Sequence, residues 1–157
     1  MSLSSDVSFS FQCDSISEDE FHVLQFSGTE TLGDLYQFDI QLISYSDTLD
    51  TDALLEGNCT LTINSYGKKR AFNGILSNFN YLKTTENGYL FEATLVPRLW
   101  LLTQFTTNEV YLGLSLSETL TLLFDEAGLT SDEYDLSLIS SYRPWDYRCQ
   151  FGESHYN

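Results

Sequence analysis

Three consecutive residues, Glu153, Ser154 and His155, have the residue types of a hydrolytic triad. A serine nucleophile needs a histidine base within hydrogen-bond reach and an acid that orients the histidine. Neighbours on an extended chain point to alternate sides, so these three cannot form that relay. The other histidine, His22, lies within a predicted strand, where a surface or internally satisfied side chain is the simpler interpretation. We predict no catalytic residue. A hydrolase using Ser154 and His155 is an alternative that requires a cleft holding both.

Acidic clusters could bind a metal ion, but their spacing does not favour it. Asp47, Asp50 and Asp52 lack the glycine and the distal glutamate of an EF-hand loop. A second acidic group at 132–135 is also better explained as a solvated loop. The glycines are scattered singly, so no phosphate-binding loop is expected. The sequence therefore predicts no metal and no cofactor.

The net charge of −16, from 23 acidic against 7 basic residues, restricts the classes of partner. Nucleic-acid binding needs clustered Lys and Arg, and an anionic membrane surface would repel the chain. We therefore predict no nucleic-acid partner. No apolar run approaches the ~20 residues of a membrane span, and the opening residues lack a basic leader, so no membrane insertion is expected. Cys13, Cys59 and Cys149 form no Cys-x-x-Cys motif, which favours free thiols in a reducing compartment.

The elements that position these residues are mainly strands. Alternation of apolar and polar residues predicts strands at 9–11, Phe21–Phe26, Leu35–Leu42, Cys59–Asn64, Arg70–Tyr81 and Tyr89–Val96. Gly28 is expected to end the second strand, and Gly74 to mark a bulge or a barrel corner. Ala53–Gly57 predicts a short helical turn, Tyr66-Gly67 a hairpin, and Asn87-Gly88 a type I′ hairpin turn.

Pro97 interrupts this pattern, because proline removes a backbone donor and restricts the residue before it. The apolar run 98–102 is expected to resume as a strand. Farther along, Ser115 and Glu118 form a capping-box pair, and Gly128 is placed to end a helix over 116–127. Two more strands are predicted, at Leu136–Ile139 and Tyr147–Phe151.

The expected fold class is therefore mainly β, a closed antiparallel barrel with a packed, dry centre and one short helix near 116–127. We expect the first barrel to span residues 1–108. Residues 109–157 would carry the helix and the start of an inserted or second domain. A free-standing ligand-binding barrel is the alternative, and it would need an internal cavity of roughly 300–1,000 Å³.

Several phrases in order resemble one protein family. Residues 93–102, ATLVPRLWLL, and the later Gln150–Ser154 segment resemble the amino-terminal, phage tail hub-like part of VgrG, the spike protein of type VI secretion systems. Residues 32–38 and the capped helix resemble the same family. There are two departures, since Asn73 replaces the usual histidine of a Phe-His-Gly phrase and His155 stands where aspartate often follows Glu-Ser.

The resemblance implies a structural component of a contractile injection machine. It implies a homotrimer in the full-length protein, with two similar barrels per chain, so that six barrels match a hexameric tube of the haemolysin-coregulated type. It also implies assembly in the bacterial cytoplasm and then secretion by a leaderless route. Because the family continues into a second barrel, this chain alone is expected to be monomeric or weakly associating. A baseplate hub of a contractile phage tail remains an alternative.

If function depends on contacts and not on catalysis, large aromatic side chains are the natural interface candidates. We select Tyr36, in the Leu35–Leu42 strand, with Trp100 and Trp145. The barrel wall and the subunit contacts are expected to come from the strand segments Leu35–Leu42, Arg70–Tyr81 and Tyr89–Val96.

Overall fold

A computed structural model describes residues 7–17 and 19–157 of the chain. The opening six residues, where the sequence predicts no leader, and Glu18 lie outside the described part. The chain divides into two compact units, unit 1 up to Pro97 and unit 2 from Arg98 to Asn157. The domain boundary expected at 108/109 stays a prediction. The strand at Thr106–Leu112, which spans that position, pairs with the strand at Tyr147–Ser154 within unit 2.

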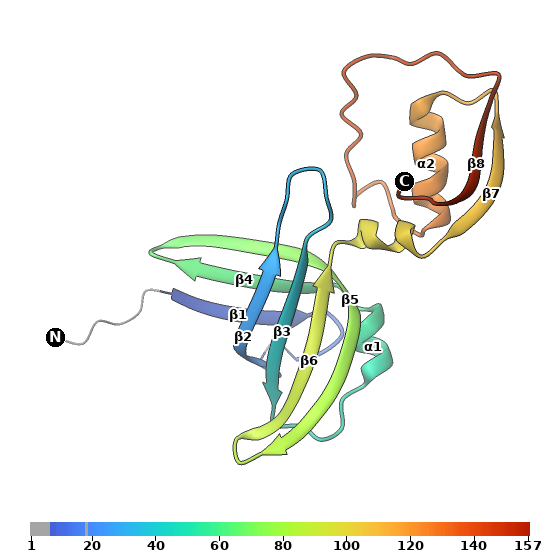
Figure 1. The fold of residues 1–157 in the computed structure, drawn as a ribbon. Coiled ribbons are helices and arrows are strands. Elements are labelled where there is room, and N and C mark those ends of the chain that lie inside the picture. The colour runs from blue at the N-terminus through green and yellow to red at the C-terminus, as the bar shows by residue number, and fades with distance from the viewer. Residues whose placement is uncertain (1–6, 18) are drawn as a thin grey trace. The chain divides into compact units, whose positions relative to one another are not determined.

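Unit 1 is a curled antiparallel sheet of six strands with one short helix (Figure 1). The sheet order is β1-β4-β5-β6-β3-β2, and every neighbouring pair is antiparallel. The mainly β, antiparallel prediction is confirmed. In chain order the elements are β1 (Val7–Cys13), β2 (His22–Thr29), β3 (Gln37–Ser44), α1 (Thr51–Glu56), β4 (Cys59–Ser65), β5 (Lys68–Thr85) and β6 (Gly88–Val96).

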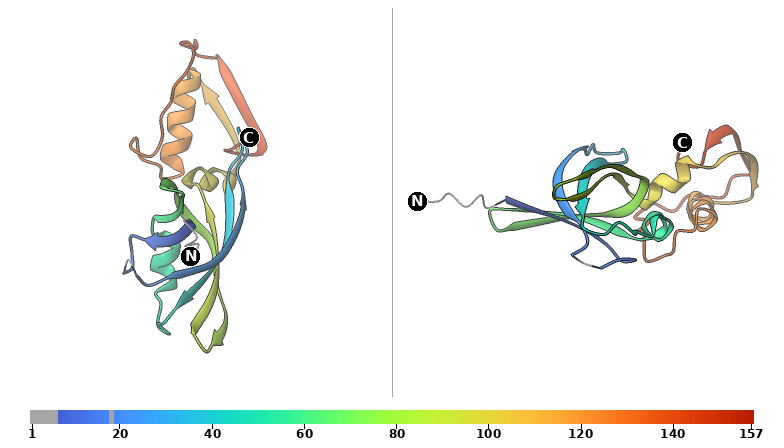
Figure 2. Two further views of the ribbon diagram at one scale, coloured as in Figure 1. Left: turned by 90° about the vertical axis from the view of Figure 1, so that its left-hand side faces the viewer. Right: turned by 90° about the horizontal axis from the view of Figure 1, so that it is seen from below.

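The curled sheet of unit 1 is not closed into a barrel by backbone hydrogen bonds among the described residues. Strands β1 and β2 are the two edges of the sheet, and no backbone pairing joins them in the part of the chain that the structure describes. Aromatic rings meet there instead: Phe9 contacts Phe26 edge-on at 5.0 Å between centroids, and Phe11 contacts Phe21 at 5.9 Å. We call this line of ring contacts the seam. The expected closed barrel is therefore a half-barrel that curls around its interior (Figure 2).

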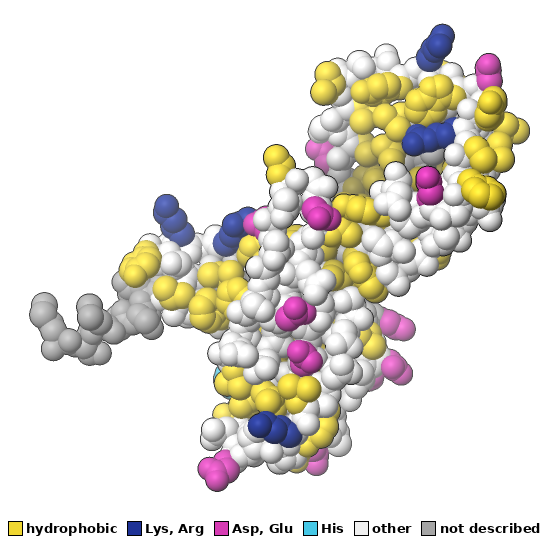
Figure 3. All heavy atoms as spheres, viewed as in Figure 1, with side chains coloured by type: hydrophobic (Ala, Val, Ile, Leu, Met, Phe, Trp, Pro, Cys, Tyr) yellow, Lys and Arg dark blue, Asp and Glu magenta, His cyan; other side chains and the backbone are white. Residues whose placement is uncertain are grey.

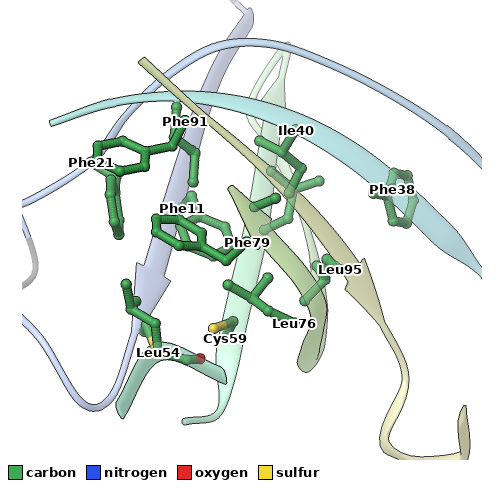
Figure 4. Close-up of a cluster of buried hydrophobic side chains, with 14 of the residues drawn as sticks. Phe11, Phe21, Phe38, Ile40, Leu54, Cys59, Leu76, Phe79, Phe91 and Leu95 are labelled. Carbon is green, nitrogen blue, oxygen red and sulfur yellow. The ribbon is translucent and has the colours of Figure 1, made fainter. Parts of the chain in front are cut away.

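Aromatic and aliphatic side chains fill the interior of unit 1 (Figure 4). Phe79 and Phe91 stack with their centroids 5.0 Å apart, and Phe21 meets both rings edge-on. Phe11 is 1% exposed, and Ile40 is fully buried. Rings in these arrangements gain roughly 0.5–1.5 kcal/mol per pair beyond the burial of their area. The centre of unit 1 is thus packed with side chains, as the sequence predicts.

The two hairpin turns differ from each other. Tyr66 and Gly67 both have positive φ, 49° and 76°, as a type I′ turn requires, so this predicted hairpin is confirmed. At the other turn only Gly88 has positive φ, 124°, and it already pairs with Thr85. The turn residues are therefore 86 and 87, and the predicted type I′ turn at Asn87-Gly88 is wrong. The Thr85 hydroxyl stabilises the turn, because it accepts from the Asn87 amide at 3.2 Å.

Two glycines allow close approach of neighbouring atoms. Gly28 lies within β2 and does not end it, although the sequence had predicted that it would. Glycine is needed there because a Cβ at this position would overlap the Phe38 ring. Gly74 lies within β5, where a Cβ would overlap the carbonyl oxygen of Val96. The bulge expected near Gly74 occurs slightly later, between Leu76 and Asn78.

Unit 2 begins immediately after Pro97, where the β6 ladder ends as predicted. Residues 98–102 are wrongly predicted as a strand, because they form part of a 3₁₀ helix. Leu136–Ile139 is also not a strand. The elements of unit 2 are η1 (Arg98–Thr103), β7 (Thr106–Leu112), α2 (Leu116–Glu126) and β8 (Tyr147–Ser154).

Helix α2 has the caps that the sequence predicts. The Glu118 amide donates to Ser115 Oγ at 3.4 Å, and Glu118 Oε2 accepts from the Ser115 amide at 2.8 Å. At the other end Gly128 has φ of 76°, and the Leu129 amide donates to the Phe124 carbonyl at 2.9 Å. This pattern is a Schellman motif. Within residues 7–17 and 19–157, no helix is both long and apolar enough to cross a bilayer.

Candidate docking surface

Tyr36, the first interface candidate, packs mainly within unit 1. Its ring is half-buried against Phe38 and Phe72, at centroid distances of 5.8 and 5.7 Å. Its hydroxyl donates to the carbonyl oxygen of Asn73. Burial, and then the neighbouring Glu30 carboxylate, raise the pKa of Tyr36 to about 12. These contacts give Tyr36 a clear role in tying the chain before β3 to β5.

Trp100 and Trp145 belong to unit 2, so neither compact unit by itself holds all three candidates. Trp100 is half-buried in η1, and its carbonyl accepts from Thr103 Oγ1 at 2.7 Å. Trp145 is 37% exposed, and its backbone is fixed by hydrogen bonds to Gly113 and Leu114. The Arg148 guanidinium lies 5.1 Å from the Trp145 ring centroid. Trp145 thus presents a fixed, partly accessible ring beside a cation.

A more extensive apolar surface lies on the ribbon formed by β7 and β8. The two strands pair antiparallel, with Val110 opposite Cys149 and Leu112 opposite Tyr147. Directly opposite residues in such a pair share one face. We define the apolar ribbon face as the five exposed residues Val110, Leu112, Tyr147, Cys149 and Phe151.

The side chains of this face extend into solvent. Exposed fractions are 59% for Val110, 68% for Leu112, 71% for Tyr147 and 81% for Phe151. In Figure 3, hydrophobic side chains gather over β7 and β8. Burying a side chain of this size gains roughly 1.5–3 kcal/mol, and contiguous apolar patches mark interaction sites more often than single exposed residues do. This face is the strongest candidate docking surface among the described residues.

The opposite face of the ribbon packs on α2. Tyr111 and Gln150 are buried, and the Tyr111 hydroxyl donates to Gln150 Oε1 at 3.1 Å. Burial, more than the nearby charges, raises the pKa of Tyr111. Tyr111 belongs to a small core with Leu123, Phe124 and other residues of unit 2. The ribbon is therefore held by one face and leaves the other open.

The apolar ribbon face is not evident from the amino-acid sequence. The apolar residues of β7, Val110, Tyr111 and Leu112, are consecutive, so the sequence does not show that Tyr111 points to the opposite face from the other two. In β8 the strand was predicted, but its partner was not. Only the cross-strand register reveals that Leu112 and Tyr147 lie together.

A cavity of about 190 Å³ lies between α2, β8 and the final residues, and both Ser154 and His155 line it. The hydrolase alternative requires such a cleft. However, the His155 nitrogens face other groups: Nδ1 lies 3.3 Å from Gln150 Oε1, and Nε2 lies 3.7 Å from Glu126 Oε2. Among the residues that the structure describes, neither nitrogen of His155 is therefore hydrogen-bonded to the Ser154 hydroxyl, as a general base would be. Among residues 7–17 and 19–157, no three His, Cys, Asp or Glu side chains group as a metal site requires.

Comparison with known proteins identifies the family. Residues 29–157 match the family described as phage tail baseplate hub (GPD). The chain belongs to the phage tail baseplate hub family. The match covers β3 to β6 of unit 1 and the whole of unit 2, so both compact units contribute to it.

Curated relatives of this hub chain include type VI secretion spike proteins of Pseudomonas aeruginosa. VgrG1c is 28% identical over 131 residues, which are 83% of this chain and 18% of the relative. VgrG4b is 27% identical over 146 residues, which are 93% of this chain and 18% of the relative. The resemblance to VgrG is thereby confirmed, and the chain spans about a fifth of the length of these relatives.

A solved structure has the same fold. It is the Escherichia coli c3393 protein, described as a component of the type VI secretion system with structural similarity to the T4 bacteriophage tail proteins gp27 and gp5. The TM-score is 0.78 at 21% identity, over 93% of this hub chain and 40% of that chain.

Proposed function

We propose that this chain is a structural part of a contractile injection machine, in which hub barrels adapt a trimeric spike to a hexameric tube. The observation that carries the proposal is membership of the baseplate hub family over residues 29–157. The filled interior of unit 1 supports it, because a packed half-barrel can act through its outer surface.

The proposed assembly follows from symmetry. A trimer with two similar barrels per chain presents six barrels, which can match a ring of six tube subunits. Unit 1 supplies one of these barrels. The proposed partner is a hexameric tube protein of the haemolysin-coregulated type, and the full-length protein is proposed to be a homotrimer. Assembly would occur in the bacterial cytoplasm, followed by leaderless secretion.

The proposal assigns no catalytic role to this chain. Both nitrogens of His155 face Gln150 and Glu126, which is the arrangement of a satisfied internal histidine. The ribbon face of unit 2 instead offers apolar area for docking. We infer that function is exerted through contacts with neighbouring subunits.

A baseplate hub of a contractile phage tail is the second candidate, favoured by the family description itself. The two candidates share the hub fold and differ in the tube they contact. A free-standing ligand-binding barrel is less well supported, because Phe11, Phe79 and Phe91 occupy the centre where a ligand would bind.

The decisive experiment displays the chain as a trimer. The chain is fused to a parallel trimeric coiled coil, and its binding to immobilised tube rings from the same source is measured by interferometry. We expect the trimer to bind much more tightly than the unfused chain, because linked copies raise the effective concentration. The coiled coil alone is the control. The proposal would be contradicted if the trimer bound neither the tube rings of secretion systems nor those of phage tails more tightly than the coiled coil alone does.

A further inference from the structure

Two buried thiols of unit 1 face each other across neighbouring strands. Cys13 is the last residue of β1, Cys59 is the first residue of β4, and they are direct partners in the antiparallel register. Cys13 is 4% exposed, and Cys59 is fully buried. Because opposite residues point to the same face of a sheet, both side chains lie on the interior side.

The backbone pattern shows which kind of pair they form. The Asp14 amide donates to the Asn58 carbonyl at 3.0 Å, immediately beyond the cysteines. Hydrogen-bonded and non-hydrogen-bonded pairs alternate along antiparallel strands, so Cys13 and Cys59 form a non-hydrogen-bonded pair. The Cα atoms of such a pair are about 4.5 Å apart, within the range of about 4.4–6.8 Å that a disulfide spans.

Helix α1 and its carboxyl-terminal cap cover the two sulfur atoms. Cys13 Sγ lies 3.9 Å from the Leu54 carbonyl oxygen, and Cys59 Sγ lies 3.8 Å from that of Gly57. A Cβ at Gly57 would be only 2.6 Å from Cys13 Sγ, so glycine permits this close cover. Burial, and next the Cys13 thiol, raise the pKa of Cys59 far above its ordinary value. The Cys59 thiol is thus protonated at neutral pH. Helix α1 and its cap shield both sulfur atoms.

We propose that Cys13 and Cys59 are a latent cross-strand disulfide site, which a small-molecule disulfide oxidises when α1 opens. One protein thiolate attacks a sulfur of the oxidant and releases one small thiolate. The second protein thiolate then attacks the mixed disulfide and releases the other. The two protein thiols lose two electrons and two protons, and the oxidant becomes two small thiols.

The bond would fix an edge of the half-barrel. Strand β1 is an outer strand of the sheet, and its ladder runs only along β4. A Cys13–Cys59 bond would close a long loop that contains β2, β3 and α1. It would therefore oppose separation of β1 from β4 and stabilise unit 1, chiefly by restricting the unfolded chain. This inference does not depend on the proposed function.

The test uses the Cys149→Ser chain, which removes the exposed thiol in β8 and keeps the buried pair. The protein is equilibrated anaerobically in mixtures of reduced and oxidised glutathione at pH 8, folded and in 8 M urea. Free thiols are then counted, and the linked peptides are identified by mass spectrometry. Because buried thiols react slowly, equilibrium is approached from both the reduced and the oxidised side, and agreement of the two results shows that it has been reached.

We expect the folded chain to form the Cys13–Cys59 bond at a proportion of oxidised glutathione at least about tenfold lower than the unfolded chain needs. The oxidised protein should be lighter by about 2 Da and should melt on the order of 10 °C higher. Cys59→Ser in the same background is the control and should give only a mixed disulfide. An equal or higher oxidant requirement for the folded chain would overturn the proposal, as would uptake of two glutathione groups.

Discussion

At Gly74 the backbone of β5 passes so close to the end of β6 that no side chain fits. The Val96 carbonyl oxygen occupies the place of a Cβ. We predict that Gly74→Ala destabilises unit 1 by roughly 2–4 kcal/mol, because two strands must separate to admit one methyl group. Urea-induced unfolding followed by near-ultraviolet circular dichroism measures this change.

Gly67→Ala is the matched control in the β4–β5 hairpin. Gly67 has φ of 76° and open space around its Cβ position, so the substitution costs only the backbone strain of about 1–2 kcal/mol. If both variants unfolded at the same urea concentration, the close approach at Gly74 would have no energetic importance.

Ser115 is the second residue whose role can be measured. It accepts from the Glu118 amide and donates to the Glu118 carboxylate at 2.6 Å. Ser115→Ala should destabilise unit 2 by about 1 kcal/mol, as the loss of a cap does. Amide hydrogen exchange in α2 measures the effect, and Ser117→Ala, which keeps the capping box, is the control. Equal protection of α2 in both variants would contradict the prediction.

The same cap predicts a dependence on pH. Hydrogen bonds from the Ser115 side chain, and then from its backbone, lower the pKa of Glu118. A group with a lowered folded-state pKa stabilises the fold above its unfolded value, about 4.3, and this stabilisation is lost as pH falls through the folded-state value. The protection factors of the α2 amides, which are corrected for the intrinsic pH dependence of exchange, should therefore fall below about pH 4.3. In Ser115→Ala this fall should be smaller, and a pH profile of protection equal to that of the unsubstituted chain would count against the assignment.

At the scale of elements, the β7–β8 ribbon has one buried and one open face. We predict that Leu112→Ser changes the unfolding free energy by less than about 0.5 kcal/mol, since Leu112 is 68% exposed. Tyr111→Ala, one residue earlier, should cost roughly 3–5 kcal/mol because Tyr111 is 7% exposed and hydrogen-bonded to Gln150. Thermal unfolding of both variants measures the contrast. Similar losses would mean that the ribbon faces are assigned incorrectly.

Sequence patterns predicted the elements whose signal is local. The α2 caps follow from Ser115, Glu118 and Gly128, and the strands of unit 1 follow from alternation. The Asn87-Gly88 turn was wrong because Gly88 already pairs with Thr85, so the turn lies one residue earlier. The prediction of a strand at residues 98–102 was wrong because an apolar run alone does not distinguish a strand from a 3₁₀ helix.

The docking surface could not be predicted, because it is created by pairing over a long distance along the chain. Leu112 and Tyr147 are neighbours only through the β7–β8 register. Interface candidates chosen by size alone included Tyr36, whose ring is packed against Phe38 and Phe72. The roles of Tyr36, Trp100 and Trp145 in subunit contacts stay predictions.

At the scale of the whole molecule, charge and the ribbon face act in opposite directions. The net charge of −16 opposes association of identical chains, whereas the ribbon face favours it. We expect the chain alone to be monomeric or weakly associating at micromolar concentration and low salt. Association should increase as salt screens the charges. Multi-angle light scattering at two ionic strengths measures this, and a tight trimer at low salt would contradict it.

The seam between β1 and β2 gives unit 1 a mechanical property. A sheet that is hydrogen-bonded all the way round has a fixed circumference, because any widening breaks its ladder. Here only side-chain contacts, such as that between Phe9 and Phe26, join β1 and β2 in the part of the chain that the structure describes. A small change in the circumference of unit 1 would therefore break none of the strand pairs of the sheet.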